Sequence, residues 1–194
     1  MSTNKNFKRL RRNKVCSNKL FDICFDDLDI DSQIVENYLI VKPKVSKGAD
    51  KIVGICVLPE FNGEFLLMKG WRYQMDEFIW QAPAGFVEYN EDPFETALRE
   101  LKEEASLSCE KNNLVSLGSF LPDAGLVEGR VALFLAMKCS KIQESIFYEV
   151  GIGDLYNFSK NDLKKLIYSS SNIGGSTITT SIRSLNYIDS LDKK

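Results

Sequence analysis

The chain has 194 residues and contains no histidine. Its length predicts one domain or two small ones, and its 44% apolar and 27% charged residues are typical of a globular protein with its own core. Without histidine the chain has no Ser-His-Asp or Cys-His nucleophilic site and no zinc held by imidazole. If the protein is an enzyme, carboxylates, lysines, tyrosines or a bound cation must do the chemistry.

The net charge of -2 argues against a dedicated nucleic-acid-binding protein, which usually has a basic domain. The five cysteines are odd in number and form no CxxC motif, which predicts reduced thiols rather than a disulfide framework or a zinc site. No apolar run has the length needed to span a bilayer, and the N-terminus lacks the apolar segment of a secretory signal. We therefore expect a cytoplasmic protein that does not enter a membrane.

Residues 1–34 carry a basic block followed by an acidic block. Seven lysines and arginines precede the first acid, and residues 22–36 then hold six acids with no base between them. One interpretation is a basic arm that touches an anionic partner. The other, which we favour from the sequence, is a frayed terminus whose two blocks stay solvated or loosely paired. We separate this N-terminal arm, or N-terminal strands, from a domain at 35–194.

The rest of the chain alternates strand and helix patterns. Asn62-Gly63 is a strong hairpin signal, and Pro83-Ala84-Gly85 marks a turn-rich stretch. Helical patterns begin near Ser159 and Ser176. β-branched and apolar residues predict strands at 35–41, 51–58, 64–68 and 131–136.

A central helix begins at Asp92. This residue is a good N-cap, Pro93 suits the first helical position, and Glu95 completes a capping box. The helix has a buried stripe formed by apolar residues at helical spacing, namely Phe94, Leu98, Leu101 and Ala105.

Three glutamates of this helix, Glu100, Glu103 and Glu104, share another face. Such a cluster is either a plain solvated helix face or a site for a hard divalent cation, since Mg²⁺ prefers oxygen ligands and is often shared with a substrate phosphate. The helix alone favours the first interpretation.

The flanking residues reverse that preference. Gly85 is followed by five residues and Glu91, then by seven residues and the run from Arg99 to Leu107. This segment resembles the Nudix hydrolase signature GX5EX7REUXEEXGU, in which U is aliphatic. It departs from the signature only at Ser106, where the family has glycine. Serine there should cost roughly 1 kcal/mol if the backbone is left-handed, and it removes no ligand.

The resemblance implies an α/β fold, namely the Nudix α/β/α sandwich around a mixed β-sheet, with an N-terminal β extension. It implies Mg²⁺ or Mn²⁺ as cofactor, with Glu100, Glu104, the carbonyl of Ala84 and Glu103 as metal ligands. Glu103 is alternatively expected to hold the water network. Arg99 and Glu91 are expected to pair and brace the loop against the helix.

Wider similarity points to the ADP-ribose and nucleoside-diphosphate-sugar pyrophosphatases. It lies in residues 66–73, 80–85, 122–128 and 143–146. By this resemblance Arg72 is a phosphate clamp and Gln81 stands where the subfamily has a substrate-contacting glutamate. Glu144 is the expected general base and Glu128 its competitor, and Trp71 either packs or stacks on a base. Trp80 is expected to pack.

The resemblance implies hydrolysis of the diphosphate of ADP-ribose or a related nucleoside-diphosphate sugar, giving a nucleoside monophosphate and a sugar phosphate. Alternatives are GDP-mannose, a dinucleotide or capped RNA as substrate, and a Nudix-fold sensor that binds a nucleotide without hydrolysing it. The subfamily is usually a homodimer in which N-terminal strands contribute across the interface.

Overall fold

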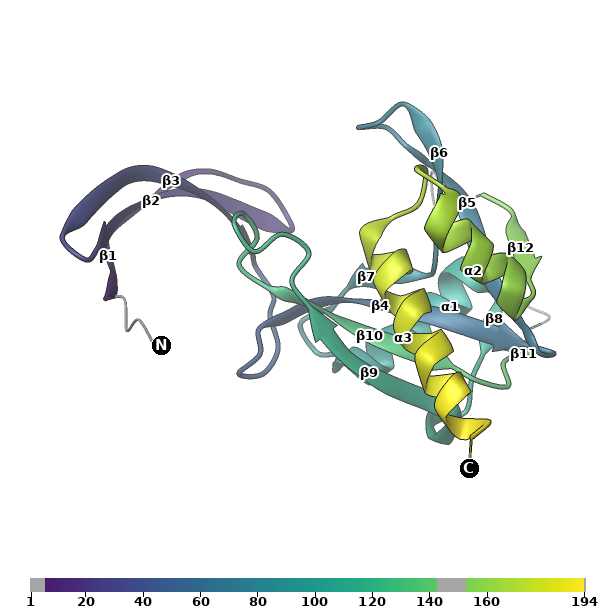
Figure 1. Ribbon diagram of the computed structural model, residues 1–194. Helices are drawn as coiled ribbons and strands as arrows, with labels where there is room; N and C mark the ends of the chain where they lie inside the picture. The colour runs from purple at the N-terminus through teal and green to yellow at the C-terminus, as the bar shows by residue number, and fades with distance from the viewer. Residues whose placement is uncertain (1–5, 143–152, 194) are drawn as a thin grey trace.

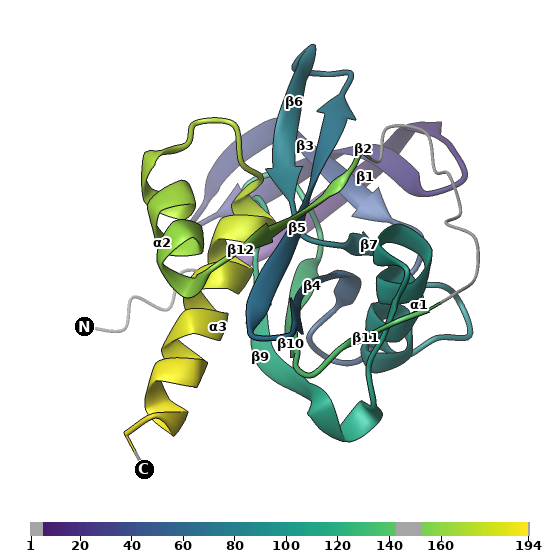
Figure 2. The ribbon, with the colours of Figure 1, turned by 90° about the vertical axis from the view of Figure 1, so that its right-hand side faces the viewer.

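The computed structural model describes residues 6–142 and 153–193, which form a three-layer body and a projecting arm. In these ranges α1 (Pro93–Ala105) covers one face of a central sheet, and α2 (Lys160–Ser169) and α3 (Gly175–Leu191) cover the other (Figure 2). The sheet comprises β4 (Ile52–Phe61), β5 (Glu64–Arg72), β6 (Glu77–Gln81), β7 (Ala84–Phe86), β9 (Leu114–Phe120), β10 (Arg130–Ala136) and β12 (Leu155–Phe158).

The sheet is mixed, with the order β12-β5-β4-β10-β9 and a parallel pair between β10 and β4. One apolar cluster lies between the sheet and α1, and it includes Leu101 and Phe134. A second cluster lies beneath α2 and α3, and it includes Leu133 and Leu163. The expected α/β sandwich is therefore confirmed, and its helices are held by burial on both faces of the sheet.

The β4–β5 hairpin splays apart, which opens space for the site. The two strands pair only beside the turn, at Glu60 with Phe65 and at Phe61 with Glu64. Farther from the turn, β5 pairs with β6 and β4 pairs with β7. The segment that follows β6 therefore enters between the two arms of the hairpin.

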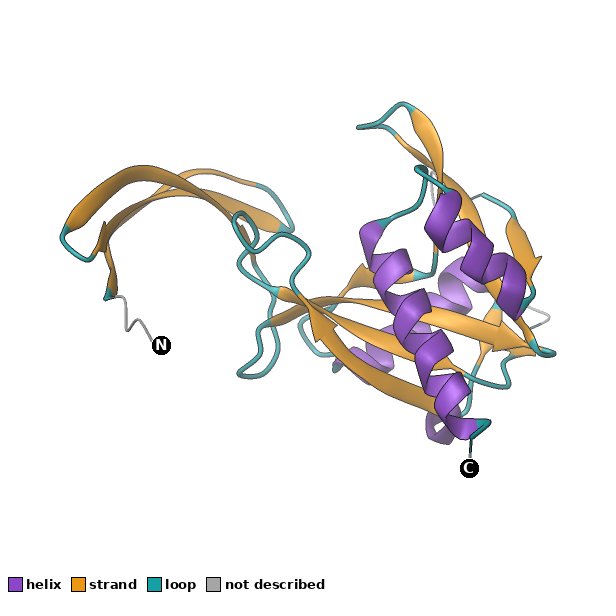
Figure 3. Ribbon diagram, viewed as in Figure 1, coloured by secondary structure: helices purple, strands orange, loops and turns teal. Residues whose placement is uncertain are grey.

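The N-terminal region forms an arm of three antiparallel strands, β1 (Phe7–Ser17), β2 (Phe21–Ile30) and β3 (Gln33–Pro43). It projects to one side of the body and is built from strands alone (Figures 1 and 3). A frayed terminus was the wrong expectation for residues 7–17. The boundary expected after residue 34 falls inside β3, so the arm extends to Pro43.

The reason is the register of β1 against β2. Arg11 lies opposite Asp27 and Arg12 lies opposite Asp26, so the basic block pairs with the acidic block across the hairpin. Arg11 and Asp27 approach to 2.9 Å. Opposite charges on facing strands stabilise an antiparallel pair. The order of the basic and acidic blocks along the chain therefore favours the β1–β2 hairpin.

Short elements complete the described chain: β8 (Leu107–Ser108), the 3-10 helix η1 (Lys111–Asn113) and β11 (Ser140–Lys141). The hairpin predicted at Asn62-Gly63 is present, with φ of 53° and 82° at these residues. The predicted helix starts are also confirmed, since Ser159 caps α2 and α3 begins at Gly175. Among the described residues, no helix has both the length and the apolar character required to cross a bilayer.

Candidate active site

Helix α1 is fixed at both ends by its own sequence. The Asp92 carboxylate accepts hydrogen bonds from the backbone N–H groups of Phe94 and Glu95 at 2.8 and 3.0 Å. The Glu95 carboxylate accepts one in return from the Asp92 N–H at 3.0 Å, which completes the predicted capping box. Ser106 follows the helix with φ 51° and ψ 39°, in the left-handed conformation expected there.

The loop before the helix is held by the predicted pair between Arg99 and Glu91. Arg99 Nε donates to Glu91 Oε1 at 2.8 Å, and Nη2 donates to Oε2 at 3.2 Å. Thr96 Oγ1, which is fully buried, donates to the same carboxylate at 3.0 Å. The hydrogen bond from Arg99 lowers the pKa of Glu91 by more than partial burial raises it, so this carboxylate stays ionised.

Arg99 also binds two of the three glutamates that share one face of its own helix. Its Nη1 lies 2.7 Å from Glu100 Oε1 and 2.9 Å from Glu103 Oε2. Burial lowers the pKa of Arg99, but the hydrogen bonds to Glu91 and Glu103 and the charge of Glu100 together raise it. One guanidinium thus serves three carboxylates, and the local charge stays negative.

The motif glycine leaves room for the Glu100 carboxylate. A Cβ atom on Gly85 would overlap Glu100 Oε1, so any other residue there would displace that carboxylate. Beside it, the Ala84 N–H donates to Glu104 Oε2 at 2.8 Å. In an antiparallel strand the N–H and C=O of one residue point to the same side, so the Ala84 carbonyl faces the Glu104 side of β7.

Cations line other parts of the same pocket, which has a volume of about 780 Å³. Arg72, at the end of β5, donates a hydrogen bond from Nη2 to Oε1 of the buried Gln81. Lys19, in the turn between β1 and β2, also lines the pocket. The pocket therefore brings together Arg72, Gln81, Ala84, Arg99, Glu100, Glu103 and Glu104, as well as Lys19.

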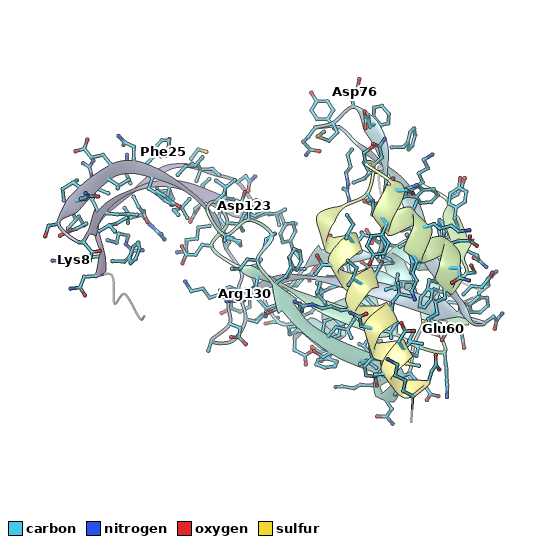
Figure 4. All side chains as sticks on the ribbon, viewed as in Figure 1. Lys8, Phe25, Glu60, Asp76, Asp123 and Arg130 are labelled. Atoms are coloured by element: carbon cyan, nitrogen blue, oxygen red, sulfur yellow. The ribbon has the colours of Figure 1, made fainter. Side chains whose placement is uncertain are left out.

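Four predicted site residues are not in this group, and one of them, Glu91, instead holds Arg99 beside the pocket. Trp71 is exposed and packs edge-to-face on Phe78 with ring centroids 5.0 Å apart, on the β5–β6 hairpin that carries Asp76 at its tip (Figure 4). Glu128 binds Arg12 at 3.0 Å and Lys51 at 2.8 Å at the base of the arm. Glu144 lies outside the described residues.

Trp80 packs, as expected from the sequence. Its ring makes edge contacts with Tyr156 and Phe158, at centroid separations of 5.1 and 5.2 Å, over the cluster beneath α2 and α3.

The donor set fits Mg²⁺ or Mn²⁺ as a shared site rather than a closed cage. Within 6–142 and 153–193, no three acidic, Cys or His side chains gather closely enough to form a complete protein-only metal cluster. Mg²⁺ commonly takes only one or two carboxylates and completes its coordination with waters and substrate phosphate. Glu100, Glu104 and the Ala84 carbonyl offer oxygen donors on one wall of the pocket.

Sequence reasoning missed two residues here, Thr96 and Lys19. Thr96 donates from α1 to Glu91, and its position one helical turn before Glu100 was the available signal in the sequence. Lys19 had no local signal. Its place in the pocket depends on the path of the whole arm, which brings the turn between β1 and β2 over the body.

A family model for the NUDIX domain matches residues 50–138, which include Gly85, Glu91 and the whole of α1. The chain therefore carries a NUDIX domain over these residues, just under half of its length. It is therefore an enzyme, a Nudix hydrolase that acts on pyrophosphate bonds, and it resembles the ADP-ribose pyrophosphatases of that family.

Relatives support this assignment at the level of sequence. The chain is 28% identical over 137 residues to an ADP-ribose pyrophosphatase of Bacillus subtilis (strain 168), covering 71% of this chain and 69% of the relative. It is 27% identical over 134 residues to a methanol dehydrogenase activator of Bacillus methanolicus, covering 69% and 68%. A crystal structure of an ADP compounds hydrolase matches 98% of both chains with a TM-score of 0.80 at 12% identity, which shows a shared fold.

Proposed function

We propose that this Nudix hydrolase uses Mg²⁺, or Mn²⁺ in its place, to hydrolyse the diphosphate of ADP-ribose or a related nucleoside-diphosphate sugar. Water is consumed, one P–O bond of the diphosphate breaks, and the products are a nucleoside monophosphate and a sugar phosphate. The observation that carries the proposal is a single pocket with a carboxylate wall on α1 and cationic side chains at Arg72 and Lys19.

The residues of the pocket divide into two roles. Glu100, Glu104 and the Ala84 carbonyl would hold the cation, with Glu103 as a further ligand or as the group that orders water. When bound, the cation neutralises the diphosphate and polarises phosphorus. Arg72, held by Gln81, would orient a phosphate oxygen by charge-assisted hydrogen bonds. Arg99 and Glu91 keep the loop in register with the helix.

The general base is assigned to Glu144 in preference to Glu128. Burial raises the pKa of Glu128, but hydrogen bonds from Lys51 and Arg12 outweigh it and lower the pKa. A carboxylate held ionised by two cations is a weaker base, and Glu128 is not among the residues that line the acidic pocket.

An apolar pocket beside the first one supports a substrate that carries a base. It has a volume of about 410 Å³ and shares Arg72, Ala84 and Gly85 with the acidic pocket. Phe21 of the arm meets Phe86 there, edge-to-face, with ring centroids 5.2 Å apart. A flat apolar ring next to a diphosphate site suits a nucleoside, in agreement with the name of the Bacillus subtilis relative.

We further propose a homodimer in a reducing, cytoplasmic environment, with Trp71 and the arm available to a second copy. A three-stranded sheet is stable only when it covers an apolar face. Yet the arm exposes Phe7, Ile34 and Val15, at 67%, 57% and 53%. A second copy of the chain would bury these side chains.

The test is product formation from ADP-ribose and GDP-mannose with and without Mg²⁺, comparing wild type with Glu104→Gln. We expect a loss of at least about 100-fold in the variant, because even groups behind a metal ligand account for 10- to 100-fold. Glu110→Gln, an exposed glutamate outside the pocket, is the matched control and should retain full activity.

Equal activity of Glu104→Gln and wild type would contradict the mechanism. Tight binding of ADP-ribose by calorimetry with no turnover by wild type would instead favour a nucleotide sensor. Turnover of a dinucleotide or capped RNA in preference to ADP-ribose and GDP-mannose would change the proposed substrate class. It would leave the proposed site unchanged.

A further inference from the structure

A pair of cysteines lies at the end of the body away from the arm, outside the active site. The strands β8 and β11 are antiparallel, with Leu107 opposite Lys141 and Ser108 opposite Ser140. Continued by one residue beyond Ser108 and Ser140, this register brings Cys109 opposite Cys139. Near them is Glu60, labelled in Figure 4, whose carbonyl accepts the Cys139 N–H at 2.9 Å.

The two thiols meet in the same small space. Cys109 Sγ lies 3.5 Å from the carbonyl oxygen of Met137, and Cys139 Sγ lies 3.4 Å from that of Ala136. Each thiol also has the largest influence on the pKa of the other, so the two are neighbours. Facing residues in an antiparallel pair have Cα atoms about 4.5 or 5.5 Å apart, and a disulfide needs roughly 4.4–6.8 Å. A pair that continues the β8–β11 register therefore has the backbone spacing that suits a disulfide.

The two cysteines differ in access and in acidity. Cys109 is half-buried, whereas Cys139 is buried within the cluster beneath α1. The hydrogen bond from Cys139 lowers the pKa of Cys109 despite partial burial, and the same contact together with burial raises the pKa of Cys139. Since the thiolate is the nucleophile, Cys109 is the residue that reacts first.

We infer that Cys109 and Cys139 are a redox modification site, which closes to an intramolecular disulfide on reaction with a low-molecular-weight disulfide. The Cys109 thiolate attacks one sulfur of the reagent and releases the other half as a thiolate. The Cys139 thiol then gives up its proton to solvent and attacks Cys109 Sγ, which releases the second half. Two protein thiols are oxidised and one reagent disulfide is reduced to two thiols, so atoms and electrons balance.

The bond would join the strand that follows α1 to the strand that follows β10. Ser106, the residue after α1, already accepts a hydrogen bond from the Ile142 N–H at 3.0 Å, so the cross-link adds to an existing contact. Closing a loop of about 30 residues restricts the unfolded chain, which should raise the melting temperature by roughly 5–10 °C.

The test incubates the full chain in buffers of glutathione and glutathione disulfide at graded ratios, traps free thiols with iodoacetamide and measures intact mass. We expect a loss of about 2 Da, a 109–139 cross-link in a non-reducing digest, and full reversal by dithiothreitol. The melting temperature of the oxidised wild type should rise as stated above. Cys16→Ser, which removes the exposed cysteine of the arm, is the matched control and should behave like wild type.

Cys109→Ser and Cys139→Ser should each abolish the cross-link and the rise in melting temperature. Cys109 is the less buried of the two, so its variant keeps the test valid if Cys139→Ser does not fold. The proposal is overturned by complete alkylation of Cys109 in oxidising buffer, by a stable glutathione adduct there, or by a cross-link through any other cysteine.

Discussion

The arm and the acidic pocket both concentrate charged side chains, but the charges are balanced differently in the two regions. In the arm, Arg12 holds Asp26 with two hydrogen bonds of 2.8 Å, and Arg11 holds Asp27 at 2.9 Å. Asp26 and Asp27 are thus held by two different arginines. In the pocket, Arg99 alone serves three carboxylates, and Glu104 binds the backbone N–H of Ala84.

This difference shows what each region is built to do. Paired charges on facing strands fix a register and need nothing else. Carboxylates in excess of cations repel one another, and a divalent cation relieves that repulsion while adding charge that attracts a diphosphate. The site is therefore completed by binding, whereas the ion pairs of the arm are complete in the chain itself.

Replacing Arg99 should have the largest effect on stability of the changes considered for the two regions. Arg99→Gln leaves Glu91, Glu100 and Glu103 facing one another in a partly buried site, and we expect a loss of about 3 kcal/mol in the free energy of unfolding. Urea denaturation with and without Mg²⁺ measures the effect. Mg²⁺ should stabilise the variant more than wild type, because the cation replaces lost positive charge.

Arg99→Lys is the matched control for this experiment. It keeps the charge but not the planar fork, so its loss should be intermediate. Equal stability of all three proteins in the absence of divalent cation would show that the guanidinium does not hold the carboxylates together.

Within the arm, two neighbouring ion pairs should differ. The carboxylate of Asp26 is 4% exposed, so Arg12→Ala leaves a buried charge and should lower the opening free energy of the β1–β2 amides by about 2 kcal/mol. Arg11, 70% exposed, should matter by no more than about 0.5 kcal/mol when replaced by alanine. Native-state hydrogen exchange measures both, and equal effects would contradict the ranking by burial.

Ser106→Gly should give a small effect, and a favourable one. Serine there is left-handed, so glycine should raise the free energy of unfolding by about 1 kcal/mol without changing activity. Thermal melts and initial rates measure it. Ser108→Gly is the control, because Ser108 lies in a strand and gains nothing from glycine. A destabilised Ser106→Gly variant would mean that the hydroxyl has a role of its own.

The sequence by itself determined the helix and its carboxylates. The cap at Asp92, the capping-box partner Glu95 and the left-handed Ser106 all depend on residues within a few positions of one another, and such short-range hydrogen bonds can be predicted from order alone. The spacing of Glu100, Glu103 and Glu104 on one face follows from the helical repeat in the same way.

Tertiary structure alone decided what faces that helix. Gly85 lies beneath Glu100, and Gln81 holds Arg72, because β4 and β5 splay and admit the segment between them. Lys19 reaches the pocket only through the path of the arm. Charge pattern suggested two solvated blocks, but strand register turned them into a paired sheet. The register of β1 against β2 and the separation of β4 from β5 are set by contacts between distant segments. Periodicity in the local sequence does not predict such contacts.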